Sequence, residues 1–215
     1  MGTTHRLSAR RRVLLRFERE LWARGIVRIA GVDEVGVGPL AGPLIAAAVI
    51  LPPEVSLRGI DDSKKLSRPV RTRLSDAIKA VAVGVGLGVV TPEEVDRLNT
   101  FWAAIEAMRR AIAALPEPAE HLLLDARRIP ELALPQDAII KGDRRSYSIA
   151  AASIIAKVER DARMDALDPL YPQYGFAHHM GYGTREHLDA LARYGPCPIH
   201  RRSFIPVNQA RLPGL

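Results

Sequence analysis

The sequence contains a single cysteine, Cys197, among its 215 residues. A lone cysteine cannot form a disulfide within the chain and excludes the cysteine-rich zinc modules, which favours a reducing compartment. Long hydrophobic runs are also lacking, because the longest candidate, residues 40–51, is interrupted by Gly42 and Pro43. No membrane-spanning helix is therefore expected. The basic N-terminus is not followed by the apolar core of a signal peptide, and we expect a soluble cytoplasmic protein.

Lysine is scarce as well, but the rest of the composition is ordinary. Hydrophobic residues make up 47% and charged residues 26%, which excludes disordered and fibrous classes. The net charge of +7 is concentrated at the ends: residues 1–30 carry eight Arg and two acids, and residues 193–215 carry four Arg and no acid. A near-neutral body with basic ends suits a polyanionic partner such as nucleic acid, although solvated basic tails would give the same composition.

The hydrophobic pattern predicts strands and helices that alternate over much of the chain. Strands are expected at 27–33, 45–51, 83–90, 122–125 and 137–141, and helices at 7–24, 67–81, 91–115, 148–166 and 184–194. Thr91, Pro92 and Glu94 form a capping-box pattern, and a break in that helix is expected near Asn99. Three strands come first and two more alternate with helices, which predicts an α/β domain with a mixed five-stranded sheet flanked by helices.

Three segments are predicted along the chain. Residues 1–24 form a basic N-terminal helix or arm, and residues 25–168 form the α/β body. Residues 169–215, which begin with a stretch dense in Tyr, Pro, Gly and His, form a loop-and-helix extension. No internal repeat or low-complexity linker separates these segments.

Four carboxylates lie at the carboxyl ends of predicted strands. Asp33 and Glu34 close an apolar strand, Asp125 ends the apolar run HLLLD, and Asp143 follows the run AIIKG. Adjacent carboxylates repel each other, and a divalent cation would offset that repulsion because hard cations prefer oxygen ligands. Their convergence would form a two-metal site for phosphoryl transfer. The alternative for Asp33 and Glu34 is an acid pair that simply faces solvent.

Two further patterns carry weaker signals. Gly36 and Gly38 would let the backbone approach a ligand and offer N–H donors to a phosphate, although this spacing is more often a plain turn. The histidines of the last third of the chain could suggest zinc, but no cysteine pair or HExxH motif accompanies them. They are His178, His179, His187 and His200.

With these residues assembled, the chain resembles bacterial ribonuclease HII over roughly residues 27–207. The motifs are GVDEVGVGPLAGP (31–43), DDSKKLS (61–67), LLLDA (122–126), KGDRRSYSIAAASIIAKVERD (141–161), YPQYGFAHHMGYGT (171–184) and HRRSF (200–204). The resemblance implies a ribonuclease H-like fold with a C-terminal helical extension. It also implies an endonuclease that uses Mn²⁺ or Mg²⁺ to cut the RNA strand of RNA/DNA hybrids. Such an enzyme nicks duplex DNA 5′ to embedded ribonucleotides, leaves 3′-hydroxyl and 5′-phosphate ends, and serves ribonucleotide excision repair.

The resemblance assigns the catalytic and metal-binding roles to the same four acids, Asp33, Glu34, Asp125 and Asp143. It further implies that Tyr182 packs on the sugar beside the scissile junction. Without the resemblance, Tyr182 would be interpreted as a packing residue between two glycines.

Substrate contacts are expected from the loop that follows the acid pair. Backbone groups of Gly36, Val37 and Gly38 would hydrogen-bond the 2′-hydroxyl, and Lys64 either touches a phosphate or lies in a solvated loop. Residues 200–202 either contact the nucleic acid backbone or face water.

Three residues depart from the family pattern. Val37 and Met180 stand where Arg and Lys are usual, and Ala126 stands where Gly usually follows the third acid. The loss of these two positively charged side chains affects the expected affinity or junction selectivity more than the chemistry.

A monomer is expected. Two alternatives to this endonuclease function are a hybrid-binding protein without catalysis and a nuclease of the same fold that ignores single ribonucleotides.

Overall fold

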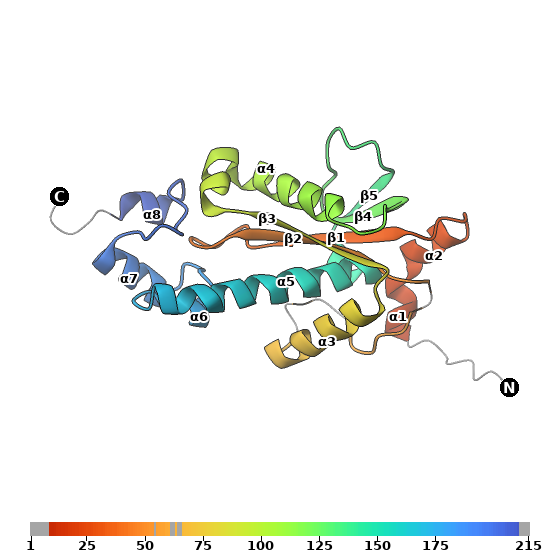
Figure 1. The fold of residues 1–215 in the computed structure, drawn as a ribbon, viewed down its shortest axis with the longest axis horizontal. Coiled ribbons are helices and arrows are strands. Elements are labelled where there is room, and N and C mark those ends of the chain that lie inside the picture. Colours follow the sequence, from red (N-terminus) through yellow and green to blue (C-terminus); the bar gives the residue numbers. More distant parts are fainter. Residues whose placement is uncertain (1–8, 54, 61–62, 64–65, 211–215) are drawn as a thin grey trace.

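The computed structural model describes residues 9–53, 55–60, 63 and 66–210 (Figure 1). The strands are β1 (Ile29–Val35), β2 (Leu44–Ile50), β3 (Gly84–Val90), β4 (His121–Asp125) and β5 (Gln136–Ile139). The helices are α1 (Ala9–Leu14), α2 (Arg16–Trp22), α3 (Arg68–Val81), α4 (Pro92–Ala113), α5 (Tyr147–Leu167), α6 (Phe176–His179), α7 (Arg185–Tyr194) and α8 (Ile205–Gln209), with 3₁₀ turns η2 (Gly142–Arg144) and η3 (Asp168–Leu170).

The five strands form one sheet in the order β3-β2-β1-β4-β5. The pairs β1/β2 and β2/β3 are antiparallel, whereas β1/β4 and β4/β5 are parallel. The predicted mixed five-stranded sheet is therefore confirmed. Because β1, β4 and β5 are parallel, their carboxyl ends lie at the same edge of the sheet, and the residues that follow them are brought near one another.

Helices cover both faces of the sheet. In Figure 1, α4 lies on one face, and α5 lies on the other with α3 packed outside it. The glycines of β3 explain the close approach of α4: a Cβ atom on Gly86 or Gly88 would overlap the carbonyl oxygens of Ala111 and Ala107 in that helix. A strand of alternating Gly and apolar residues therefore presents a smooth face to α4 and a branched face to α5 and α3.

The expected break in α4 is present at Asn99, whose φ of 63° and ψ of 168° interrupt the helix. The Asn99 Oδ1 atom accepts hydrogen bonds from the backbone N–H groups of Phe101 (2.9 Å) and Trp102 (3.2 Å), so the residue caps the second part of the helix. The predicted capping box at Thr91 and Glu94 is also present.

The predicted helix over residues 7–24 is divided at Leu15 into α1 and α2. Leu15 is buried in the cluster formed by the body of the protein. Three residues later, the buried Glu18 carboxylate accepts hydrogen bonds from Ser146 Oγ (2.7 Å) and from the N–H of Ser148 (2.9 Å). The described part of the N-terminal segment therefore packs against the start of α5.

In Figure 1, α1 and α2 lie at one end of the molecule, whereas α7 and α8 lie at the other. Among the described residues, no helix combines the length and the hydropathy needed to cross a bilayer.

Gly31 of β1 provides a test of how closely α5 must approach the sheet. A Cβ atom at this position would overlap the backbone of Ser148 and Ile149, whereas a Cβ atom on Gly38 would meet nothing within 4 Å. We expect Gly31→Ala to lower the free energy of unfolding by about 2–3 kcal/mol, because α5 must move. Gly38→Ala should stay within about 0.5 kcal/mol of wild type. Equal urea midpoints for the two variants would contradict this packing.

Candidate active site

Asp33 and Glu34 extend from opposite faces of the sheet. Val32, one residue before Asp33, belongs to the core cluster that includes α4, whereas a Cβ atom on Gly31 would meet α5 and Val35 packs on the α5 side. Because side chains alternate along a strand, Asp33 lies on the α5 face and Glu34 on the α4 face. The pair therefore presents one carboxylate to each side of the sheet edge.

Asp125 and Asp143 lie with Asp33. Leu124 is in the α4-side cluster, so the next residue of β4, Asp125, lies on the α5 face. Asp143 is buried in η2, the turn that leads from β5 into α5. The Asp125 Oδ1 atom accepts a hydrogen bond of 2.6 Å from the N–H of Gly142, which ties the end of β4 to this turn. The topology brings the predicted acids to one edge.

The pKa of the Asp33 carboxyl reflects the proximity of the other three acids. Its side chain is only 6% exposed. Burial raises the pKa of the Asp33 carboxyl well above its usual range, and the charges of Glu34, Asp125 and Asp143 raise it further. A hydrogen bond from the Ser153 hydroxyl opposes this shift without cancelling it. The fold therefore concentrates more negative charge here than its own donors neutralise.

The donor set fits a hard divalent cation. All four groups are carboxylates, and positive charge would favour the ionised form of Asp33 that the protein alone disfavours. Among the described residues, no group of three or more His, Cys, Asp or Glu side chains is arranged so that it could hold a metal ion. Protein groups contact the carboxylates of Asp33 and Glu34. The Glu34 N–H donates to Asp33 Oδ1 at 2.8 Å, and Arg127 Nη2 lies 3.6 Å from Glu34 Oε1.

The loop after β1 is held from below by Arg201, which is fully buried. Its guanidinium donates to the carbonyl oxygens of Gly36 (2.6 Å), Val37 (2.9 Å) and Gly42 (2.9 and 3.2 Å). Gly36 has a φ of +91°, and a Cβ atom there would collide with the side chain of Arg160. This glycine is therefore required both by the turn and by the arginine beneath it.

Arg160 of α5, also fully buried, joins the same loop to the C-terminal segment. It donates to the carbonyl oxygens of Pro43 (3.0 Å), Ala41 (3.2 Å) and Met180 (2.9 Å). Its Cζ atom lies 5.8 Å from the centroid of the Tyr182 ring. One side chain thus sets the relative position of the two loops that were predicted to bind substrate.

The sequence did not predict that these two arginines support the loops from within the protein. Burial lowers the pKa of Arg201 to about 9, with a further contribution from the charge of Arg160, and burial lowers the pKa of Arg160 as well. Both remain cationic at neutral pH, so the loops rest on positive charge. The expectation that residues 200–202 contact nucleic acid or face water is wrong for His200 and Arg201, because both are buried.

The predicted substrate residues lie in different environments. The Val37 side chain packs against the α4-side core. It is apolar and points inward, and therefore does not supply the positive charge of the Arg that is usual at this position in the family. Gly38 has open space beside it, and Tyr182 is 42% exposed. Ala126 adopts a φ of 58°, the left-handed conformation that favours glycine, which gives a physical reason for glycine at this position in the family.

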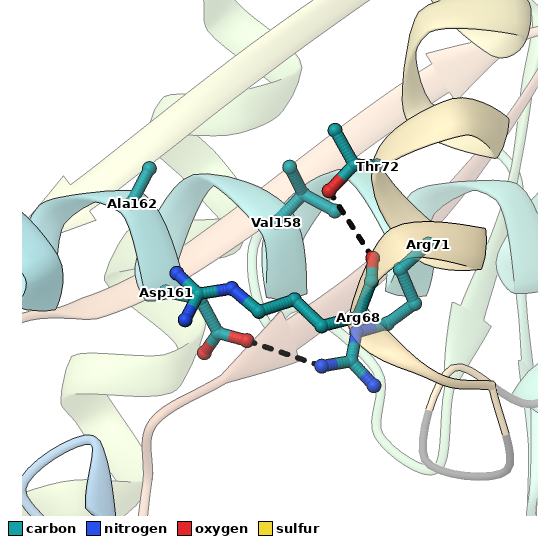
Figure 2. A pocket seen from close by; sticks show the side chains of 6 residues that line it. All are labelled: Arg68, Arg71, Thr72, Val158, Asp161 and Ala162. Atoms are coloured by element: carbon teal, nitrogen blue, oxygen red, sulfur yellow. Dashed lines mark hydrogen bonds and ion pairs between the residues drawn. The ribbon is translucent and has the colours of Figure 1, made fainter. Parts of the chain in front are cut away.

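Lys64 lies outside the described residues, but its neighbour Ser63 is described. Ser63 Oγ is 2.8 Å from Ser153 Oγ, the hydroxyl that contacts Asp33. Arg71 of α3 donates to the carbonyl oxygens of Ser63 (3.2 Å) and Leu66 (2.5 Å). Figure 2 shows Arg71 in the cleft between α3 and α5, where it also pairs with an aspartate of α5. Ser63 and Leu66, the described residues on either side of Lys64, are therefore both held by Arg71.

Two of the C-terminal histidines, His187 and His200, form a buried hydrogen-bonded chain. The N–H of Cys197 donates to His200 Nδ1 (3.0 Å), which leaves His200 Nε2–H to donate to His187 Nε2 (3.0 Å). His187 Nδ1–H then donates to the carbonyl of Tyr182 (2.9 Å). The chain requires neutral imidazoles and supports the Tyr182 loop. The ring nitrogens of these two histidines are therefore engaged by protein groups.

Comparisons with known proteins agree with this architecture. The sequence profile described as Ribonuclease HII matches residues 30–207. A ribonuclease HII of Geobacillus kaustophilus (strain HTA426) is 55% identical over 205 residues, 95% of this chain and 78% of that protein. The crystal structure of the ribonuclease H2 from Pyrococcus horikoshii OT3 matches with a TM-score of 0.73 and 25% identity, covering 85% of this chain and 96% of that chain. The fold is also that of Bst-RNase HIII in complex with Mn²⁺, at a TM-score of 0.60 and 18% identity over 86% of this chain and 69% of that one.

Acidification should destabilise the protein through His200. Burial lowers its pKa to about 4, with help from His187, so between pH 6.5 and about 4 the unfolded state binds a proton that the folded state does not. The free energy of unfolding should therefore fall by roughly 2 kcal/mol between pH 7 and pH 5. Urea unfolding should show a smaller pH dependence in His200→Gln, whereas the exposed His178→Gln should behave as wild type. An unchanged pH dependence in His200→Gln would contradict this assignment.

Removing one charge from the acid cluster should stabilise the metal-free protein. Because the ionised Asp33 is disfavoured in the fold, Asp33→Asn should raise the melting temperature in EDTA by about 2–4 °C, the shift expected from roughly 1 kcal/mol at this chain length. Asp76→Asn, at an exposed site on α3, should leave it unchanged. Added Mn²⁺ should stabilise wild type more than Asp33→Asn. A lower melting temperature for Asp33→Asn in EDTA would show that repulsion at Asp33 is not significant.

Proposed function

The chain belongs to the ribonuclease HII family, and on that premise we propose that it hydrolyses the RNA strand of RNA/DNA hybrids with two divalent ions and nicks duplex DNA 5′ to an embedded ribonucleotide. The products are 3′-hydroxyl and 5′-phosphate ends, and the protein acts as a monomer. The coarser activity, that of a hydrolytic endoribonuclease acting on hybrids, follows from membership in the family.

The observation that supports the chemistry is the raised pKa of Asp33 in a cluster of four acids. Asp33, Glu34, Asp125 and Asp143 would hold Mn²⁺ or Mg²⁺. When bound, such ions activate water and stabilise the attacking and leaving oxygens of the phosphate. The contribution of this chain is to bring the four carboxylates to one sheet edge, and to orient Asp33 through Ser153 and Asp125 through Gly142.

Recognition of the ribonucleotide would come from backbone groups of the Gly36–Gly38 loop and from Tyr182. The 2′-hydroxyl is the group that distinguishes ribose from deoxyribose, and donors or acceptors left unpaired by deoxyribose would select against it. Arg201 fixes the loop through the Gly36 and Val37 carbonyls. Arg160 fixes the Tyr182 loop through the Met180 carbonyl.

The inward packing of Val37 favours one narrower alternative. Without a cation at this position, the loop has less grip on the phosphate beside the junction, and selectivity for a single ribonucleotide would decrease before activity on a continuous hybrid does. The alternative is therefore a nuclease of hybrids that ignores isolated ribonucleotides.

The test is a nicking assay on an RNA/DNA hybrid, a DNA duplex with one ribonucleotide, and an all-DNA duplex. With Mn²⁺ or Mg²⁺ we expect cleavage of the first two and none of the third. Asp33→Asn should reduce kcat by at least about 10²-fold while still binding the duplex, because it removes a carboxylate that would hold the ions.

Each other outcome has a defined meaning. Cleavage of the hybrid alone would favour the narrower alternative. Salt-sensitive binding without cleavage under any metal would point to a non-catalytic binding protein. Undiminished cleavage by Asp33→Asn would reject the site.

A further inference from the structure

Two large aromatic side chains lie exposed where α4 restarts after its break. Phe101 and Trp102 are each 48% exposed, and their rings meet edge to face with centroids 5.2 Å apart. The Asn99 side chain caps both of their N–H groups and so fixes the turn that presents them. Aromatic residues make up only 5% of the sequence, which makes an exposed pair at one turn an unusual surface.

Arg127 connects this pair to the acid cluster. Its Cζ atom lies 5.6 Å from the centroid of the Phe101 ring, and its Nη2 atom lies 3.6 Å from Glu34 Oε1. The Arg127 side chain is 30% exposed, so the guanidinium remains accessible from solvent. Phe101, Trp102 and Arg127 therefore form a continuous ledge on the α4 face that begins beside Glu34.

The chemistry of the ledge matches that of a sugar–phosphate backbone. Aromatic rings pack on the apolar faces of sugars and bases, and guanidinium pairs with phosphate oxygens. A ledge that offers both groups side by side suits a chain in which sugars and phosphates alternate. A purely apolar partner would leave the guanidinium desolvated, which disfavours a hydrophobic protein surface as the occupant.

We propose that the ledge of Phe101, Trp102 and Arg127 is a binding subsite for the sugar–phosphate backbone of the nucleic acid beside the acid cluster. The inference rests on the proposed function, because the occupant is the substrate duplex. Tyr182 belongs to the C-terminal segment, whereas the ledge belongs to α4 and the turn after β4. The duplex is therefore held from two separate elements of the fold.

Tryptophan fluorescence reports on the ledge directly, because the chain has two tryptophans, Trp22 and Trp102. In a Trp22→Phe, Asp33→Asn protein, which binds without cutting, a short RNA/DNA hybrid should quench the Trp102 emission saturably. In a Trp102→Phe, Asp33→Asn protein, the remaining Trp22 in α2 should show no such change.

Affinity measurements separate the two halves of the ledge. Phe101→Ala and Trp102→Ala should each weaken hybrid binding roughly tenfold, the effect of losing one stacking contact. Tyr194→Ala is the matched control. Tyr194 is 44% exposed, and the Arg193 Cζ atom lies 5.2 Å from the centroid of its ring, so the substitution removes a similar aromatic–arginine pair from the surface of α7. Its affinity should be unchanged.

Salt dependence isolates the contribution of Arg127. Loss of one phosphate contact should reduce the slope of log K against log salt by about 0.9 in Arg127→Ala. Arg127→Lys, which keeps the charge, should restore most of that slope, and Trp102→Ala should leave the slope unchanged. This separation also distinguishes a phosphate contact from an indirect effect on Glu34.

The outcomes distinguish the ledge from the proposed function. If wild type cleaves the hybrid, but Trp102 emission and the affinity of the ledge variants do not change, the ledge is wrong and the function stands. Weaker binding only in variants that also lose their folded structure would likewise overturn the ledge. Failure of wild type to bind or cut the hybrid would overturn both.

Discussion

The repulsion among carboxylates at one sheet edge is the constraint on which the rest of this structure depends. Asp33 is buried and is repelled by the charges of three other acids, a placement that destabilises the fold in the absence of a cation. The parallel arrangement of β1, β4 and β5 makes the cluster unavoidable, because it carries all three strand ends to the same edge. A sequence that keeps such a cluster sacrifices stability for a site where positive charge is favoured.

Positive charge buried beneath the loops complements this negative cluster. Arg160 and Arg201 direct their described hydrogen bonds to backbone carbonyls, and these carbonyls belong to the loop after β1 and to the C-terminal segment. Carbonyl dipoles satisfy the donors without neutralising the charge. A polyanion that approaches these loops therefore meets a preorganised surface with two guanidinium charges buried behind it, even though Val37 and Met180 supply no charged side chain.

Features that depend on residues close together in the sequence were predicted, whereas features that depend on distant residues were not. The break at Asn99 and the cap at Thr91 depend on neighbours within a few residues, and the placement of the four acids at one sheet edge followed from their positions at strand ends. The opposite directions of Asp33 and Glu34 were available from strand alternation. The support that Arg160 and Arg201 give to the loops was missed because their partners lie 117 and 165 residues away, as in the bonds to Pro43 and Gly36, and no local pattern indicates such distant contacts. The division at Leu15 also depends on packing against the distant body.

The turn after β4 is where the two faces of the sheet become one site. Asp125 ends the strand on the α5 face, and Ala126 then adopts a left-handed φ of 58° at some cost in backbone strain. The N–H of Arg127 donates back to the Asp125 carbonyl at 2.7 Å, so the turn is tight, and the Arg127 side chain comes out on the α4 face beside Glu34. Residues two positions apart thus lie on opposite faces: the Asp125 carboxylate lies on the α5 face, and the Arg127 guanidinium links Glu34 to the exposed aromatic pair on the α4 face. A shift of this turn would therefore displace Asp125 and Arg127 together, and with them the proposed metal ligands and the proposed backbone subsite.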